Sequence, residues 1–133
     1  DFVDRFFDDD SVLERPQRIG VIATAGDRRD QDMVDLGRQA AKHFDVIIVR
    51  EDDRLRGRQP GETARLVVQG AREGQAEGGR VKQIETVLDE IESTRTAVER
   101  ANPGDLVVVC VDRARAVWDE LQVLAKRAQP TDD

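Results

Sequence analysis

The stretch that decides the fold covers residues 18–30 and reads Arg-Ile-Gly-Val-Ile-Ala-Thr-Ala-Gly-Asp-Arg-Arg-Asp. Its apolar run, residues 19–25, is typical of a strand buried on both faces, as in a parallel sheet. Gly26 allows the tight turn that follows. Residues directly after such a strand face the crevice at the carboxyl end of the sheet, where open α/β proteins bind ligands. The sequence therefore predicts a ligand-facing edge that carries Asp27, Arg28, Arg29 and Asp30.

Size and composition favour one folded domain. The chain has 133 residues, of which 38% are hydrophobic and 37% charged, and the apolar residues are grouped in periodic blocks. The net charge of −7 argues against a general nucleic-acid or anionic-membrane surface. No apolar stretch approaches the roughly 20 residues that span a bilayer. The single cysteine, Cys110, can form no internal disulfide and is expected to be a buried hydrophobe, which suits a reducing cytoplasm.

Helical and strand periods alternate along the chain. Apolar residues that recur every three to four positions indicate helices, and short β-branched runs indicate strands. Asp30 is the expected N-cap of the first of these helices. Strands that alternate with helices indicate an α/β sandwich of three layers around a mostly parallel sheet. After the first strand, the predicted order is helix 31–44, strand 45–50, helix 62–73, minor strand 80–84, helix 85–101, strand 106–111 and helix 113–128.

The two ends of the chain are expected to lie outside this sandwich. Phe2, Val3, Phe6 and Phe7 recur at helical spacing, so residues 1–17 are interpreted as the end of a helix and a linker from a preceding domain. Residues 18–128 would form the α/β domain, and residues 129–133 a polar tail.

A second group of charges follows the second predicted strand. Residues 51–58 read Glu-Asp-Asp-Arg-Leu-Arg-Gly-Arg. Successive βα units end at the same sheet edge, so these charges are expected beside residues 27–30. Guanidinium groups bind carboxylates and phosphates in a fork geometry, so several converging arginines could hold an anionic substrate. The alternative is a solvated loop with exposed ion pairs, which contribute little stability.

The two charged loops together resemble the C-terminal domain of the Mur ligase superfamily, most closely its cyanophycin synthetase branch. The first motif is Gly-Asp-Arg-Arg-Asp at 26–30, followed by Asp32 and Leu-Gly at 36–37. The second is Glu-Asp-Asp at 51–53, followed by Leu-Arg-Gly-Arg at 55–58 and Gly-Glu at 61–62. The resemblance covers about residues 18–121. It implies a Rossmann-like third domain of a cytoplasmic three-domain ligase, which activates a carboxylate with ATP as an acyl phosphate and joins it to an amine.

The resemblance also implies roles for particular residues. Asp27 matches the family's aspartate that contacts the nucleotide ribose, and Arg28 and Arg29 lie where relatives place cations near the phosphates or the incoming amino acid. Diaminopimelate recognition is not implied, because residues 52–55 depart from the Asp-Asn-Pro-Arg of the diaminopimelate-adding relatives. The implied contacts to an amino-acid or polypeptide substrate are Asp53, Arg54, Arg56 and Arg58.

The phosphate-binding loop of these ligases is missing. No Gly-x-x-x-x-Gly-Lys-Ser/Thr motif occurs in the chain. ATP and Mg²⁺ are therefore expected in a full-length enzyme, with the central P-loop domain of the same chain as partner, and neither cofactor nor a metal site is expected to be intrinsic to this fragment. No catalytic residue is assigned within the fragment, which is expected neither to hydrolyse ATP nor to ligate substrates. A homo-oligomer is left open.

The alternative hypothesis is a stand-alone flavodoxin-like binding or regulatory module without catalysis. A phospho-receiver version of such a module would need an acidic pair after the first strand, an acceptor aspartate after a central strand and a lysine after a late strand. Asp112 and Arg113 follow the last strong strand instead, which argues against that version.

Overall fold

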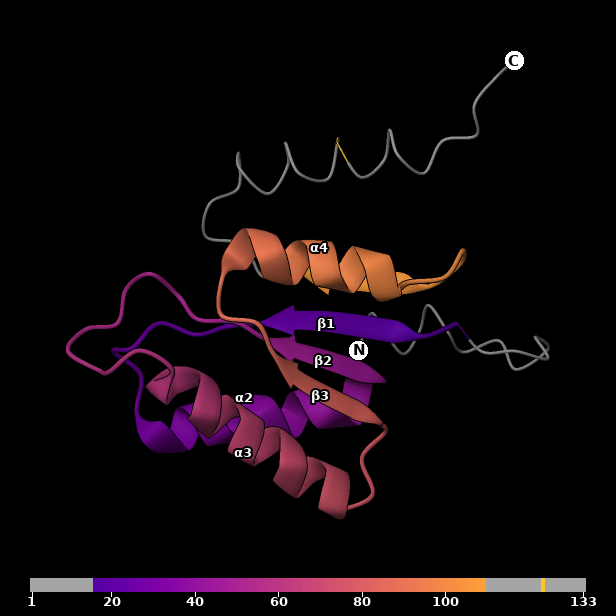
Figure 1. Cartoon of the computed structure of the whole chain (residues 1–133). Coiled ribbons are helices and arrows are strands. Elements are labelled where there is room, and N and C mark those ends of the chain that lie inside the picture. The colour runs from indigo at the N-terminus through magenta and orange to yellow at the C-terminus, as the bar shows by residue number, and fades with distance from the viewer. Residues whose placement is uncertain (1–15, 110–122, 124–133) are drawn as a thin grey trace.

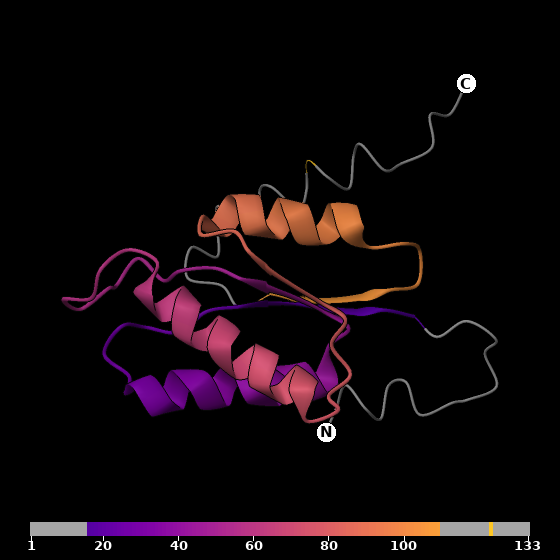
Figure 2. The ribbon, with the colours of Figure 1, turned by 60° about the horizontal axis from the view of Figure 1, so that its bottom comes forward.

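The protein is a sheet covered by helices on both faces, as seen in a computed structural model that describes residues 16–109 and 123 (Figure 1). Helices α2 (Asp30–His43) and α3 (Glu62–Ala76) lie on one face. Helix α4 (Glu90–Arg100) lies on the opposite face, and both views keep it apart from α2 and α3 (Figure 2). The expected three-layer, Rossmann-like α/β class is confirmed.

The sheet is parallel throughout its described strands. Its order is β3-β2-β1-β4, which places β1 (Arg18–Ile22) between β2 (Val46–Val49) and β4 (Leu106–Val109), with β3 (Gln83–Thr86) beyond β2. Ile19 of β1 lies opposite Val46 on one side and Val107 on the other. Every residue of β1 and β2 is buried, as expected for central strands with helices on both faces.

Helices α2 and α3 approach each other so closely that their backbones meet. A Cβ atom on Gly37 of α2 would overlap the carbonyl oxygen of Val67, and one on Gly70 of α3 would overlap the carbonyl oxygen of Val34. Glycine is therefore required at both positions. The larger hydrophobic core lies between these helices and the sheet, and its fully buried members include Met33, Ala41, Ile47, Val49 and Ala71.

The opposite face has a smaller apolar core and a buried ion pair. Ile19, Val21, Val46, Ile48 and Ala97 form the core under α4. Arg50, directly after β2, is 2% exposed, and its Nη1 lies 3.6 Å from the carboxylate of Glu90, the first residue of α4. The ion pair ties the start of α4 to the end of β2.

Several predicted boundaries were wrong, and tertiary contacts explain the differences. The first strand ends at Ile22, not at residue 25, because the chain leaves the sheet after the Arg50 amide donates to the Ile22 carbonyl at 2.9 Å. The helix predicted at 62–73 continues to Ala76, because Gly74 packs inside the helix pair against Ala41. The helix predicted at 85–101 begins only at Glu90, where the Asp89 side chain caps it by accepting from the Glu92 amide at 2.9 Å.

The minor strand predicted at 80–84 is shifted toward the carboxyl end. Residues Gln83–Thr86 pair with β2 from Val46 to Val49, which draws the start of the expected helix into the sheet.

The remaining expectations for the chain ends lie outside the described residues. They are the end of a helix and the linker before residue 16, buried Cys110, the helix at 113–128 and the tail at 129–133. Within the described part of the chain, no helix has the length and apolar character needed to cross a membrane.

Candidate functional site

Two loops meet at the carboxyl end of the sheet. The first loop, residues 23–29, joins β1 to α2, and the second loop, residues 50–61, joins β2 to α3. They lie together beyond the arrowheads of these strands, on the left of Figure 1. All seven site residues predicted from the sequence, from Asp27 to Arg58, lie on this pair of loops, which confirms their shared edge and leaves their roles untested.

The loops touch through their backbones. The Gly26 amide donates to the carbonyl of Arg54 at 2.9 Å. A Cβ atom on Gly26 would overlap the carbonyl oxygen of Leu55. The glycine is therefore needed for close approach of the second loop.

Arg58 joins the two loops through its guanidinium group. Its side chain is only 18% exposed. We call the resulting set of contacts the Arg58 bridge, and because they occupy Nε and both Nη atoms, Arg58 is engaged by the protein on all sides of its fork. The partners are the carbonyls of Gly26 and Arg28 (both 2.8 Å) and the carboxylates of Asp30 (2.7 Å) and Glu62 (2.6 Å). The hydrogen bonds to Asp30 and then Glu62 raise the pKa of Arg58 further above its ordinary value.

Two acids of the second loop also have structural partners. The Glu51 carboxylate accepts from the Gly61 amide at 2.5 Å and from the Thr63 hydroxyl at 3.3 Å, so it closes the start of α3. Asp52, which is 5% exposed, binds the guanidinium of Arg54 through both carboxylate oxygens at 3.1 Å. Asp53 is exposed at the rim of a cavity of about 300 Å³ beside this loop.

The first loop is different, because the first two of its charged side chains bind no other described residue. Asp27 and Arg28 are exposed, and neither side chain makes a hydrogen bond or ion pair within the described residues. Arg29 binds Asp32 through two hydrogen bonds of 3.0 and 3.1 Å, and this hydrogen bonding lowers the pKa of Asp32. Arg29 is itself 82% exposed.

Asp30 does not cap α2 as predicted. The N-cap is Arg29, no side chain caps this helix start, and Asp30 is its first helical residue. The reason is the Arg58 bridge, which draws the Asp30 carboxylate toward the second loop and away from the backbone of its own helix.

Arg56 lies at the tip of the second loop in an unusual conformation. Its φ of 53° is in the left-handed region, and it is followed by Gly57 with φ of 88°. The Arg58 amide closes this turn on the Leu55 carbonyl at 3.1 Å. The exposed side chain of Arg56 makes no hydrogen bond or ion pair within the described residues. Arg56 is therefore the arginine of this loop that is available to a ligand.

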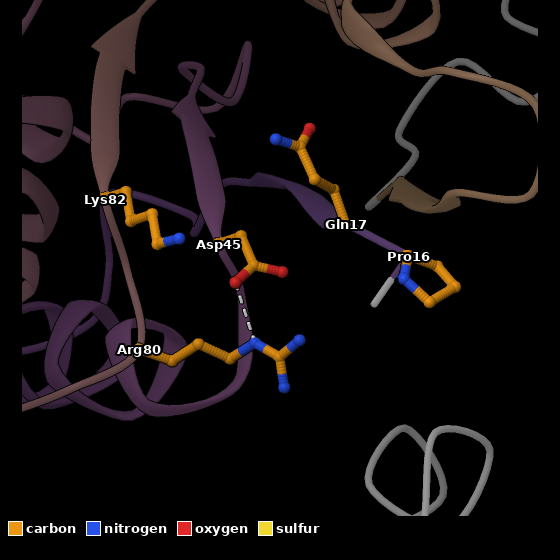
Figure 3. Close-up of a pocket in the computed structure, with 5 residues that line it drawn as sticks. All are labelled: Pro16, Gln17, Asp45, Arg80 and Lys82. Atoms are coloured by element: carbon orange, nitrogen blue, oxygen red, sulfur yellow. Dashed lines mark hydrogen bonds and ion pairs between the residues drawn. The ribbon is translucent and has the colours of Figure 1, made fainter. Parts of the chain in front are cut away.

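The described residues contain no group of three metal-ligating side chains. At the opposite, amino end of the sheet lies a cavity of about 580 Å³ (Figure 3). There the Asp45 carboxylate accepts from the Arg18 amide and from Arg80 Nε, both at 2.8 Å, and so joins β1, β2 and the segment before β3. Parallel sheets bind ligands at their carboxyl ends, which favours the two loops over this cavity.

Sequence reasoning missed the residues that support the site. Glu51 was grouped with acids of the second loop, and Arg50 and Glu90 were not singled out. A charge directly after a buried strand was the available signal for Arg50. Nothing local indicated that its partner would lie at the start of α4.

Comparison with known protein families shows which family the chain belongs to. Residues 10–113 match the family described as Mur ligase, glutamate ligase domain. The chain is a member of this Mur ligase family.

Individual proteins that this Mur ligase domain resembles are synthetases and ligases by name. It is 42% identical over 93 residues to the cyanophycin synthetase of Crocosphaera subtropica and 45% identical over 93 residues to that of Synechocystis sp.. It is 36% identical over 93 residues to the UDP-N-acetylmuramoyl-L-alanyl-D-glutamate–2,6-diaminopimelate ligase of Corynebacterium efficiens. These alignments cover 70%, 70% and 69% of the chain, but only 10%, 10% and 18% of the relatives.

Proposed function

We propose that the chain is the C-terminal domain of an ATP-dependent ligase that forms amide bonds through an acyl phosphate. Its two loops would contribute to the nucleotide and amino-acid sites, beside a P-loop domain of the same polypeptide. Family membership supports the ligase class. The observation that carries the site is the contrast at one sheet edge. The side chains of Asp27 and Arg28 make no hydrogen bond or ion pair within the described residues, whereas the Arg58 guanidinium binds protein groups on all sides of its fork.

The residues of the first loop suit a nucleotide. A carboxylate such as Asp27 accepts hydrogen bonds from ribose hydroxyls, and a guanidinium such as Arg28 binds phosphate oxygens in a fork. Arg29 can exchange Asp32 for a phosphate at low cost, because exposed ion pairs contribute little stability. ATP, when bound, would supply the phosphoryl group that activates a carboxylate. We assign no Mg²⁺ ligand to the described residues, because no three of their side chains group suitably.

The second loop suits the amino-acid or polypeptide substrate. Arg56 is exposed at the tip of this loop, and its side chain makes no hydrogen bond or ion pair in the part of the chain that the structure describes, so we assign it to a substrate carboxylate. Asp53 is exposed beside it and would face a cationic group of the substrate. Arg54 and Arg58 bind Asp52 and the Arg58 bridge partners, so in this proposal they present the loop and touch substrate only at their exposed edges.

Steady-state kinetics of the full-length ligase test the nucleotide role. Asp27→Ala is expected to raise the KM for ATP, because losing ribose hydrogen bonds costs about 1–3 kcal/mol, or roughly 5- to 150-fold. Glu99→Ala on α4, an exposed carboxylate on the other face of the sheet, is the matched control and should leave the KM unchanged. Unchanged ATP kinetics in Asp27→Ala would remove this residue from the site.

The same assay separates the two loops. Arg56→Ala is expected to raise the KM for the amino acid or polypeptide and to leave the KM for ATP at its wild-type value. An effect of Arg56→Ala on ATP alone would contradict the assignment.

A further inference from the structure

A groove beside α3 begins at Gly61, the last residue of the second loop, and extends along the helix away from the other loop residues. Its cavity volume is about 460 Å³. Ala64 and Val68 of α3 and Leu88, which follows β3, supply its apolar lining. Leu88 is 42% exposed, more than most large apolar side chains in the part of the chain that the structure describes. The polar side is formed by α3 residues Arg65, Gln69 and Arg72.

Arg65 and Arg72 differ from most arginines of the described residues in making no ion pair there. The chain carries 28 acidic and 21 basic residues, so carboxylates are in excess. Most arginines of the described part use them: Arg29, Arg38, Arg50, Arg54, Arg58, Arg80 and Arg100 all form ion pairs. Arg65 and Arg72 make no side-chain hydrogen bond or ion pair within that part, a property that they share with Arg28 and Arg56 of the loops. An apolar surface beside two unpaired cations fits a ligand that is both apolar and acidic.

The spacing of the two arginines selects the shape of that ligand. Seven residues along a helix correspond to about 10.5 Å, so the bases of Arg65 and Arg72 are two turns apart on one side of α3. An extended peptide in the polyproline II conformation rises about 3.1 Å per residue with three residues per turn. Acidic residues three positions apart in such a peptide therefore share a face at a separation of about 9 Å.

We propose that this groove binds an extended acidic peptide of another polypeptide chain, with two carboxylates three positions apart and apolar side chains between them. The carboxylates would pair with Arg65 and Arg72, and an apolar side chain would cover Val68 and Leu88. Guanidinium–carboxylate pairing over a covered apolar surface is a common basis for such recognition. The inference does not depend on the nucleotide or amino-acid roles of the loops.

Fluorescence anisotropy with the 133-residue chain and a labelled synthetic peptide, Gly-Asp-Leu-Leu-Asp-Gly, tests the proposal. Binding is expected to weaken at least tenfold in Arg65→Glu/Arg72→Glu, and at least tenfold when asparagine replaces both aspartates of the peptide. Leu88→Ser should weaken it to a smaller extent. Lys42→Glu/Lys82→Glu, which changes the net charge equally at two exposed lysines, is the matched control and should bind almost as the wild type does.

Three results would overturn the proposal. They are no binding of the acidic peptide at millimolar concentration, equal binding of the asparagine peptide, or equal weakening in the lysine control. Circular dichroism of each variant shows whether it is folded, and the asparagine peptide tests the carboxylates without any change to the protein. Concentration-dependent dimerisation in sedimentation that Arg65→Glu/Arg72→Glu abolishes would overturn the stated occupant in favour of a second copy of the chain.

Discussion

The loop after β1 and the loop after β2 carry similar charges but use them differently. In the second loop, Glu51 closes the start of α3, Asp52 holds Arg54, and Arg58 reaches across to the first loop. In the first loop, the side chains of Asp27 and Arg28 have no such partners among the described residues, and none of those residues caps the start of α2 with its side chain. Most charges of the second loop, Arg56 excepted, stabilise the shape of the loops, whereas Asp27 and Arg28 of the first loop are left available to a ligand. Charged residues in a loop therefore indicate a binding site only where their side chains are not already bound to other residues of the protein.

The largest effect on the contact between the two loops is expected from a substitution at Gly26. In Gly26→Val, the new side chain would overlap the Leu55 carbonyl, and the loops would have to separate. We expect a loss of about 1–3 kcal/mol in the free energy of unfolding, measured by chemical denaturation. Gly57→Ala is the comparison variant, because φ is positive there and nothing lies within 4 Å, so its loss measures the backbone penalty alone. Gly26 has no positive φ, so the loss in Gly26→Val is expected to be steric. A wild-type free energy of unfolding in Gly26→Val would contradict the steric explanation.

Removing the Arg58 bridge should loosen the contact between the two loops without introducing a steric clash. In Arg58→Ala, the carbonyls of Gly26 and Arg28 lose their donor, so we expect faster amide hydrogen exchange at Gly26 and a lower Tm. Arg58→Lys should be intermediate, because one ammonium cannot reach partners on both sides of the fork. Arg65→Ala is the control: it removes an arginine of α3 whose side chain makes no ion pair between residues 16 and 109, so its Tm should stay at the wild-type value. Unchanged exchange at Gly26 in Arg58→Ala would show that the backbone contact alone holds the loops.

Arg56 tests the comparison further, because it is assigned to a ligand although it lies in the loop whose other arginines bind the protein. Arg56→Gly should be as stable as the wild type or more stable by up to about 1 kcal/mol, because a left-handed conformation costs glycine little. Arg56→Val should lose about 1–2 kcal/mol in denaturation, since it combines a branched side chain with positive φ. Both variants should lose the same substrate contact. Equal stability of the two would show that the turn relaxes to another conformation.

The smallest expected effect concerns Asp32 and pH. Its hydrogen bonds from Arg29 lower its folded pKa below the unfolded value, so its contribution to stability is present above the unfolded pKa and is lost as the pH falls through the folded pKa. Asp32→Asn should therefore lower the Tm slightly at pH 7, and the two proteins should converge in strong acid. The effect is small because the pair is exposed. A difference that grows on acidification would contradict the assignment.

The sequence was sufficient to predict the features that depend on local pattern. Residues 19–22 and 46–49 were recognised as buried strands, and the charges after them were placed at one edge, because hydrophobic period and the rules of βα units are local or general. The start of α4 was missed because pairing with β2 competes with helix formation at residues 83–86. The role of Arg58 was also hidden, since three of its four partners lie far away in sequence: Gly26 and Arg28 in the first loop and Asp30 at the start of α2.

The position of β1 has a consequence for how the chain acquires its shape. Arg18 is paired with Leu106, the Leu106 amide donates to the Gln17 carbonyl at 2.9 Å, and the Gln17 amide donates to Asp105 at 2.8 Å. Among the described strands, β1 is synthesised first, yet one of its two neighbours, β4, is synthesised last. Contacts so distant in sequence slow folding, because a long stretch of chain must be ordered before they form. During synthesis on the ribosome, Asp27 and Arg28 would therefore emerge long before the central strand beneath them has both of its neighbours.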